Sequence, residues 1–279
     1  MKPLLTLALT VAAILAFAGN SVLTRLALSS HDISPAMFMG VRLISGAAML
    51  AAIGLARGLT FAPGPKDLAG IAALFIYALA FTYAYVAMGA ATGALILFGV
   101  VQLTVSAIAM VMGHAPRTRD VLGIAIALAG LGWLLLPRAS APPILAALLM
   151  IVAGVAWGFY TVEGRKGGHA VARTARNFLG AAVLAGIWLV AAQPEWPGLH
   201  GLLLALASGI FTSALGYVMW YAVVPHMNVF TAGALQLLVP AVAAAGGFLL
   251  LGEHLPGEFL LASALILGGI ALTLKRVRA

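Results

Sequence analysis

Long apolar segments recur from one end of this sequence to the other, and they constrain the fold more than any other feature. One helix needs about 20 apolar residues to cross the hydrocarbon core of a bilayer. Ten segments qualify, approximately 4–28, 34–56, 68–88, 92–113, 120–137, 142–163, 173–192, 199–223, 228–251 and 257–275. Because only 8% of the 279 residues are charged, a soluble domain of this size could not cover its surface. The sequence therefore predicts an all-α membrane protein with ten transmembrane helices in a lipid bilayer.

The first of these segments begins like a secretory signal peptide. Lys2 precedes an apolar run, and Ala16-Phe17-Ala18 has the small residues of a cleavage site. The run continues to Leu28, however, and nine more apolar segments follow it. We therefore expect this segment to remain in the protein as an uncleaved first helix.

Lys and Arg residues between the segments predict the orientation of the chain, because cytoplasmic loops carry an excess of them. The loops on the side of the N-terminus hold eleven, namely Lys2, Arg57, Lys66, Arg117, Arg119, Arg165, Lys166, Arg173, Lys275, Arg276 and Arg278. The loops on the other side hold only Arg138. We expect a multi-pass protein of a bacterial inner membrane with both termini in the cytoplasm. The net charge of +8 is thus explained by orientation, and no nucleic-acid partner is expected.

The two halves of the sequence are similar to each other. At a shift of 140 residues the matches are Gly93-Ala94-Leu95 with Gly233-Ala234-Leu235, His114 with His254, Pro116 with Pro256, Phe17 with Trp157 and Arg25 with Arg165. We expect two five-helix repeats, residues 1–138 and 139–279. Because five is an odd number, the second repeat enters the membrane in the opposite direction, and such inverted repeats are common in secondary transporters. A duplication that serves only structure is the alternative.

Three arginines, Arg25, Arg42 and Arg176, fall inside predicted helices. Arg42 and Arg176 match between the repeats when a short gap is allowed. A charge within the membrane is costly, so it normally faces a cavity or the protein interior and has partners there. The two arginines are therefore candidates for a gate or for a contact with a carboxylate. The alternative is an arginine that reaches the membrane surface or caps neighbouring carbonyl groups.

Aromatic residues follow one face of two predicted helices. Tyr77, Phe81 and Tyr85 recur every four residues, and Tyr217 belongs to a matching stripe in the second half. We expect Tyr77, Phe81 and Tyr217 to face a central cavity, where rings can stack on an apolar or aromatic ligand. Ordinary packing and interfacial anchoring are the alternatives. These alternatives are favoured for Tyr85 and Tyr221, which approach helix ends.

Polar side chains at membrane depth complete the set of candidates. Asn20 and Tyr160 occupy equivalent positions in the first and sixth segments. Trp157 lies one turn before Tyr160, and Gln236 lies within the ninth segment. An unpaired donor at such a depth costs several kcal/mol. We expect these side chains to line the cavity and orient the polar groups of a ligand, with hydrogen bonds to a neighbouring helix as the alternative.

The residue types needed for most enzyme and cofactor chemistry are absent or scattered. The chain has no cysteine, which excludes disulfides, cysteine nucleophiles and thiolate metal sites. Its six histidines lie in loops or at helix ends, without an H-E-x-x-H motif. The string closest to a serine-protease nucleophile turn is Leu43-Ile44-Ser45-Gly46. We therefore expect no enzyme activity, no metal and no cofactor.

Three motifs near the end of the sequence resemble a known family. They are Leu235-Gln236-Leu237-Leu238-Val239-Pro240, Gly252-Glu253-His254 and a small-residue helix from Ala262 to Ala271. Together they resemble the end of the EamA domain of the drug/metabolite transporter (DMT) superfamily, whose ten-helix members carry two such domains. Trp157-Gly158 resembles the tryptophan-glycine pair near the start of that domain, and Arg42 resembles the usual arginine of its second helix. The first half departs from the pattern, with Phe17-Ala18 and Gly113 at the corresponding positions.

The resemblance covers nearly the whole chain and implies a function. The aromatic residues of the third, sixth and eighth helices are similar to those of bacterial aromatic amino acid exporters of this superfamily. Alternating-access export of aromatic and other neutral amino acids, or of related small metabolites, is therefore implied. A sugar-phosphate, nucleotide-sugar or drug carrier of the same superfamily is the second choice, and a structural membrane protein is the choice outside transport. Because the seven carboxylates lie in loops or at helix ends, we expect facilitative transport.

The predicted orientation can be tested with single cysteines, because the chain has none of its own. A cysteine at His31 or Glu195 should react with a membrane-impermeant thiol reagent added outside intact cells, since the arginine and lysine bias places these loops outside. A cysteine at Lys66 or Arg119 should react only after the membrane is opened. The opposite labelling pattern would contradict both the orientation and the inverted duplication.

Overall fold

The computed structural model describes residues 3–59, 61–113, 116–135, 143–166, 169–252 and 259–274, and the regular elements in these ranges are all helical. The prediction of an all-α protein is confirmed. The elements are α1 (Pro3–Ser29), α2 (Pro35–Ala56), η1 (Pro65–Asp67), α3 (Leu68–Ala84), α4 (Ala90–Val111), α5 (Thr118–Leu135), α6 (Ile144–Glu163), η2 (Gly164–Lys166), α7 (Ala170–Ala192), α8 (Leu199–Ala207), η3 (Ser208–Leu215), α9 (Gly216–Val223), η4 (Val224–His226), α10 (Val229–Gln236), α11 (Leu238–Leu251) and α12 (Phe259–Leu274).

Eight helical segments among the described residues are long and apolar enough to cross a membrane. Their ends agree with the predicted segments to within four residues, and α5 and α12 occupy the fifth and tenth predicted segments. The largest difference is at α3, which ends at Ala84 because the chain turns there before α4 begins at Ala90. The hydroxyl of Tyr85 donates a hydrogen bond to the carbonyl of Ala90 at 3.2 Å across this turn.

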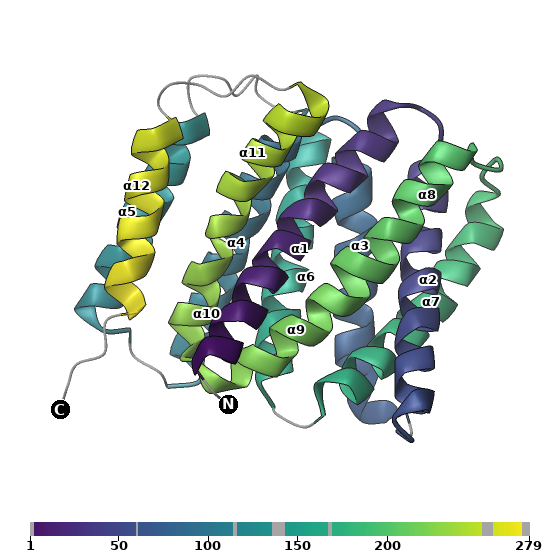
Figure 1. Cartoon of the computed structure of the whole chain (residues 1–279), viewed down its shortest axis with the longest axis horizontal. Helices are drawn as coiled ribbons and strands as arrows, with labels where there is room; N and C mark the ends of the chain where they lie inside the picture. The colour runs from purple at the N-terminus through teal and green to yellow at the C-terminus, as the bar shows by residue number, and fades with distance from the viewer. Residues whose placement is uncertain are drawn as a thin grey trace.

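The helices stand side by side in one bundle, with the start of α1 and the end of α12 at the same end (Figure 1). α1 packs against α8, η3, α9 and α11, whereas α6 packs against α3 and α4. α2 packs against α7 and η3, and α5 and α12 contact each other at one edge of the bundle (Figure 1). Helices from the two halves of the chain are therefore interleaved, and side chains far apart in sequence meet at the centre.

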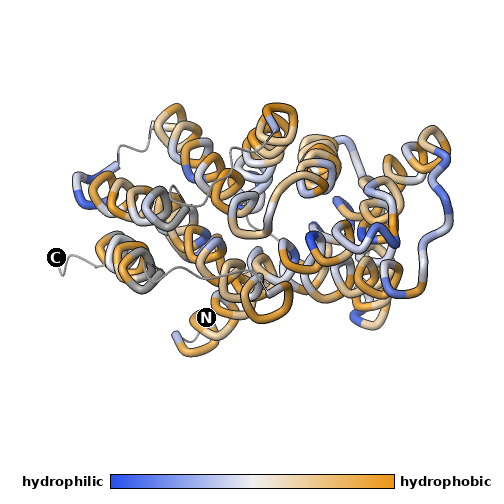
Figure 2. Tube along the Cα trace, turned by 90° about the horizontal axis from the view of Figure 1, so that it is seen from above, coloured by the Kyte–Doolittle hydropathy of each residue, from blue (hydrophilic) through white to orange (hydrophobic). Residues whose placement is uncertain are grey.

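The outer surface of the bundle is apolar. Figure 2 shows hydrophobic residues along the outer helices. Leu4, Val111 and Leu249 are 79%, 89% and 75% exposed, respectively. Such side chains lose nothing when they face lipid tails, which are equally apolar. The surface therefore fits a protein that is surrounded by a bilayer.

Small residues bring two central helices close together. A Cβ atom at Gly154 of α6 would lie 2.7 Å from the Cβ of Val100, and one at Gly158 would lie 2.8 Å from the Cβ of Thr104. Contacts this short do not occur between real Cβ atoms, so α4 and α6 can approach this closely only because both positions are glycine. Close packing of this kind holds membrane helices together where no hydrophobic effect acts between them.

Two transmembrane spans are irregular in their middle sections. The span that runs from α8 to η4 contains η3, which is a π-helical turn. The span that contains α10 and α11 is interrupted at Leu237. Pro240 accounts for this break, because proline has no N–H to donate to the carbonyl of Gln236 and its ring crowds that carbonyl. Both irregular sections lie next to the buried polar residues of the bundle.

Some residues of the sequence analysis lie outside the described ranges. They are Lys2, His114, Arg138, His254, Pro256, Glu253, Glu258, Lys275, Arg276 and Arg278.

Candidate functional site

Aromatic rings from both halves of the chain meet in the middle of the bundle. Trp157 of α6 is at the centre, with its ring centroid 4.9 Å from that of Tyr77 and 4.7 Å from that of Tyr217. The ring of Phe81 is 5.2 Å from that of Tyr77, and the ring of Tyr160 is 5.6 Å from that of Trp157. The structure therefore brings all five aromatic candidates of the sequence analysis together.

Two further rings complete this ring cluster. Phe17 of α1 lies 5.3 Å from Trp157 and 5.8 Å from Tyr217, and Phe178 of α7 lies 5.5 Å from Tyr217, measured between ring centroids. The cluster consists of Phe17, Tyr77, Phe81, Trp157, Tyr160, Phe178 and Tyr217, each at most 4% exposed. Because these rings pack against one another, the site is closed at these side chains in this conformation.

Arg42 of α2 lies beside the ring cluster and is 1% exposed. Its Nε donates to Ser213 Oγ at 2.8 Å, and its Nη2 donates to the hydroxyl groups of Tyr217 at 2.9 Å and Tyr77 at 3.3 Å. The guanidinium carbon is 5.3 Å from the ring centroid of Tyr77 and 5.2 Å from that of Phe81. Neutral oxygens and ring faces therefore stabilise the charge, the latter through cation–π attraction.

One nitrogen of the Arg42 guanidinium is left over. Its Nη1 is buried and has no hydrogen-bond partner in the described part of the chain. The hydrogen bonds of Nε and Nη2 go to hydroxyl groups and not to a carboxylate. A buried donor without a partner and a buried cation without a counter-charge are both costly. Since guanidinium groups bind carboxylates well, Arg42 is suited to hold the carboxylate of a small molecule.

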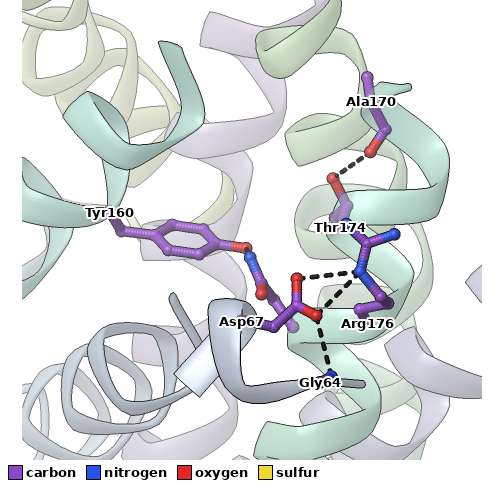
Figure 3. Close-up of polar contacts among 7 residues, drawn as sticks. Gly64, Asp67, Tyr160, Ala170, Thr174 and Arg176 are labelled. Carbon is purple, nitrogen blue, oxygen red and sulfur yellow. Dashed lines mark hydrogen bonds and ion pairs between the residues drawn. The ribbon is translucent and has the colours of Figure 1, made fainter. Parts of the chain in front are cut away.

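Arg176 of α7, which matches Arg42 in the repeat, has a different environment (Figure 3). Its Nε lies 2.9 Å from Oδ1 and 3.0 Å from Oδ2 of Asp67. Asp67 Oδ2 also accepts a hydrogen bond from the backbone N–H of Gly64 at 3.0 Å. The charge of Arg176 is therefore neutralised at the end of the bundle by a residue distant in sequence. Arg176 does not share the buried environment of Arg42.

Asn20 of α1 connects the π-helical turn η3 to the ring cluster. Its Oδ1 accepts hydrogen bonds from Ser208 Oγ at 2.7 Å and from Thr212 Oγ1 at 3.2 Å, and its Nδ2 donates to Tyr77 Oη at 3.3 Å. Sequence reasoning missed Ser208, Thr212 and Ser213. Their signal was a group of small hydroxyl residues in the middle of an apolar span, where each hydroxyl needs a partner.

The π-helical form of η3 explains how these hydroxyl groups reach their partners. Ser208 and Ser213 are five residues apart, which is the spacing of the hydrogen bonds in a π-helix. In a regular α-helix the same two residues would be about 140° apart around the axis. The wider turn brings them toward one face, where Ser208 bonds Asn20 and Ser213 bonds Arg42.

The polar atoms of the remaining candidates pair with neighbouring helices. Trp157 Nε1 donates to Gln236 Oε1 at 2.6 Å, which ties α6 to α10. Tyr160 Oη accepts from Asn177 Nδ2 at 3.3 Å, which ties α6 to α7. All eight candidate residues thus belong to one connected region, namely Asn20, Arg42, Tyr77, Phe81, Trp157, Tyr160, Tyr217 and Gln236.

The two tyrosines expected near helix ends are also buried. Tyr85 and Tyr221 are 0% and 2% exposed. Their hydroxyl groups donate to the carbonyls of Ala90 and Tyr160, respectively. Interfacial anchoring is therefore wrong for both, and packing next to the ring cluster is their observed role. Their rings lie 4.7 Å from Phe81 and 5.3 Å from Tyr160, respectively.

Comparisons with known proteins found a matching family, related sequences and a similar solved structure. Residues 144–275 match the EamA-like transporter family. An uncharacterized protein of Pseudomonas aeruginosa is 47% identical over 96% of this chain and 94% of its own length. The threonine/homoserine exporter RhtA of Salmonella typhimurium is 31% identical over 61% of this chain and 60% of its own length. A crystal structure with 25% sequence identity superposes with a TM-score of 0.76 over 94% of this chain and 98% of its own.

The hydrogen bond of Trp157 can be tested against a matched tryptophan. Trp157→Phe removes the donor to Gln236 Oε1 and leaves that oxygen buried without its partner, which costs about 1–3 kcal/mol. Trp220→Phe is the control, because Trp220 is fully buried and its Nε1 has no partner among the described residues. Denaturant titration in detergent should show the larger loss of unfolding free energy for Trp157→Phe. Equal losses would mean that this bond does not stabilise the site.

Proposed function

We propose that this chain is an EamA-like transporter and that it exports neutral amino acids, aromatic ones among them, or closely related metabolites. The transporter is a multi-pass membrane protein. The observation that carries the proposal is the buried Arg42 guanidinium, which has an unpaired nitrogen beside a cluster of aromatic rings. Such a site matches an amino acid, which joins a carboxylate to a side chain of variable polarity.

Each part of the proposed substrate has a chemical counterpart in the site. The carboxylate binds Arg42 and supplies the missing counter-charge. An apolar or aromatic side chain stacks on rings such as Trp157 and Tyr217. The ammonium group donates to neutral oxygens, among which Asn20 Oδ1 and Gln236 Oε1 are the candidates. The relative RhtA is a threonine/homoserine exporter by name, and this supports amino acids as the substrate class.

Alternating access follows from the proposed inverted duplication of residues 1–138 and 139–279. The contacts of α1 with α9 and α11 correspond to those of α6 with α3 and α4 when the two halves are exchanged. Arg25 donates to the carbonyls of Tyr85 and Val86, and Arg165 donates to those of Val224 and Met227. If the halves exchange conformations, a site open to one side becomes open to the other. The proposed setting is a bacterial inner membrane with both termini in the cytoplasm.

Other carriers of the superfamily fit the site less well. A sugar phosphate or nucleotide sugar carries several negative charges and calls for several cavity cations. Arg42 lies at the ring cluster, whereas Arg176 is paired with Asp67. A purely structural protein would not need a buried guanidinium with an unpaired nitrogen, because such a group lowers stability.

Counterflow in proteoliposomes tests the proposal, with unlabelled L-phenylalanine inside and labelled L-phenylalanine outside. Arg42→Gln should lower the rate about tenfold or more, because a charged hydrogen bond to the carboxylate is lost. Arg57→Gln is the matched control, because Arg57 is exposed directly after α2. Phe81→Ala should reduce transport of phenylalanine more than transport of threonine. Full activity of Arg42→Gln with both amino acids would contradict the proposal.

The positions of the carboxylates lead to a second transport prediction. Ion-coupled carriers generally place a carboxylate inside the membrane. In the described ranges the carboxylates lie at helix ends or between helices, namely Asp32, Asp67, Asp120, Glu163 and Glu195. We expect a facilitative carrier, so an imposed pH or sodium gradient should not drive accumulation of L-phenylalanine in proteoliposomes. Accumulation that disappears in Glu163→Gln would contradict this and identify the coupling residue.

A further inference from the structure

A cavity of about 730 Å³ lies apart from the ring cluster, at the bundle end where α4 and α6 end and α5 and α10 begin. Its walls come from the ends of α4, α5, α6 and α10. On α6 the cavity is lined by Phe159, which is about 200° around the helix axis from Trp157. Phe159 is 41% exposed. The cavity therefore lies on a different face of α6 from the proposed transport site and borders the membrane.

The cavity changes from apolar to charged along the helix axes. Ile108 and Phe159 lie about one helical turn inside the ends of α4 and α6 and supply apolar walls. Arg117, Asp120 and Arg165 lie at or beyond the helix ends and supply charged walls, as does Glu163 at the end of α6. An amphiphilic molecule at the membrane surface has the same arrangement, with a charged headgroup and apolar chains. The cavity therefore matches a lipid in its distribution of apolar and charged groups.

Asp120, in the charged part of the cavity, needs a hydrogen-bond donor from a ligand. The residue is 3% exposed, and its Oδ2 accepts a hydrogen bond from the backbone N–H of Arg117 at 3.1 Å. Its Oδ1 is buried and has no hydrogen-bond partner among the described residues. An unsatisfied buried acceptor destabilises a protein, and more so when it is charged. A ligand with a cationic N–H donor would satisfy it.

Positive groups lie in the same cavity. Arg165 lines it and is anchored through its Nη1, which donates to the carbonyls of Val224 at 3.2 Å and Met227 at 2.5 Å. Partial burial lowers the pKa of the Arg165 guanidinium, but an arginine remains protonated at neutral pH. Asn228 also lines the cavity and caps the N-terminus of α10, which carries a partial positive charge. These groups favour an anionic group next to the ammonium donor.

We propose that this cavity is a binding site for phosphatidylethanolamine. The primary ammonium of the headgroup donates to Asp120 Oδ1, the phosphate faces Arg117 and Arg165, and an acyl chain packs against Phe159. Phosphatidylcholine carries the same charges but its trimethylated nitrogen has no N–H, so it cannot satisfy Asp120. Phosphatidylglycerol has the phosphate and no cation. The site therefore distinguishes phospholipids by hydrogen-bond donation and not by net charge alone.

Native mass spectrometry of the purified full-length protein tests the site. The protein in detergent is titrated with palmitoyl-oleoyl phosphatidylethanolamine or with the matching phosphatidylcholine. The wild type should bind the ethanolamine lipid about tenfold more tightly, because a charged hydrogen bond distinguishes the two lipids. Asp120→Asn should abolish this preference. Asparagine keeps an oxygen for the backbone N–H of Arg117, so the start of α5 stays capped.

Glu195→Gln is the matched control, because it removes one exposed carboxylate between α7 and α8 at the other end of the bundle. This variant should keep the wild-type preference. Equal binding of the two lipids by the wild type, or an unchanged preference in Asp120→Asn, would overturn the proposal. Displacement of the bound lipid by L-phenylalanine would also overturn it and assign the cavity to the transported substrate.

Discussion

A permanent positive charge in the middle of a lipid-embedded bundle is the constraint on which the rest of this structure depends. Moving a guanidinium out of water is costly unless hydrogen bonds and opposite charge compensate for the lost hydration. Arg42 obtains compensation from Ser213, Tyr77 and Tyr217, and from the ring faces of Tyr77 and Phe81. Elements α2, α3, η3 and α9 must therefore stay together around it. The same contacts hold part of the ring cluster closed.

The described partners of Arg42 do not include a negatively charged group. This missing counter-charge links the stability of the protein to the proposed transport. A bound carboxylate would neutralise Arg42 and would compete with the hydroxyl groups that now surround the guanidinium. A substrate side chain would likewise replace ring–ring contacts around Trp157 with contacts of its own. A ligand shifts a conformational equilibrium only by the difference in its affinity for the two states. In the proposed site that difference would arise because the ligand contacts and the closure contacts use the same atoms.

The spans could be predicted from the sequence because lipid demands long apolar helices, and the candidate residues could be predicted because buried polar and aromatic groups stand out in such helices. The partners were harder to predict. The contact between Arg176 and Asp67 joins residues 109 positions apart, and no local pattern indicates it. Ser208 and Ser213 were missed because a regular helix would direct them to different faces, and their common role depends on a π-helical turn. The closed packing of the ring cluster could not be predicted either, because it depends on how the helices pack together.

The break at Leu237 has a mechanical consequence. In an intact helix, a sharp kink breaks at least one backbone hydrogen bond, and in lipid no water replaces it. Pro240 has already removed the bond that residue 240 would give to the carbonyl of Gln236, so α11 can tilt against α10 without that penalty. Gln236 is also the residue that holds the indole of Trp157. The point at which this span bends at the lowest energetic cost is therefore joined by a hydrogen bond to the tryptophan at the centre of the ring cluster.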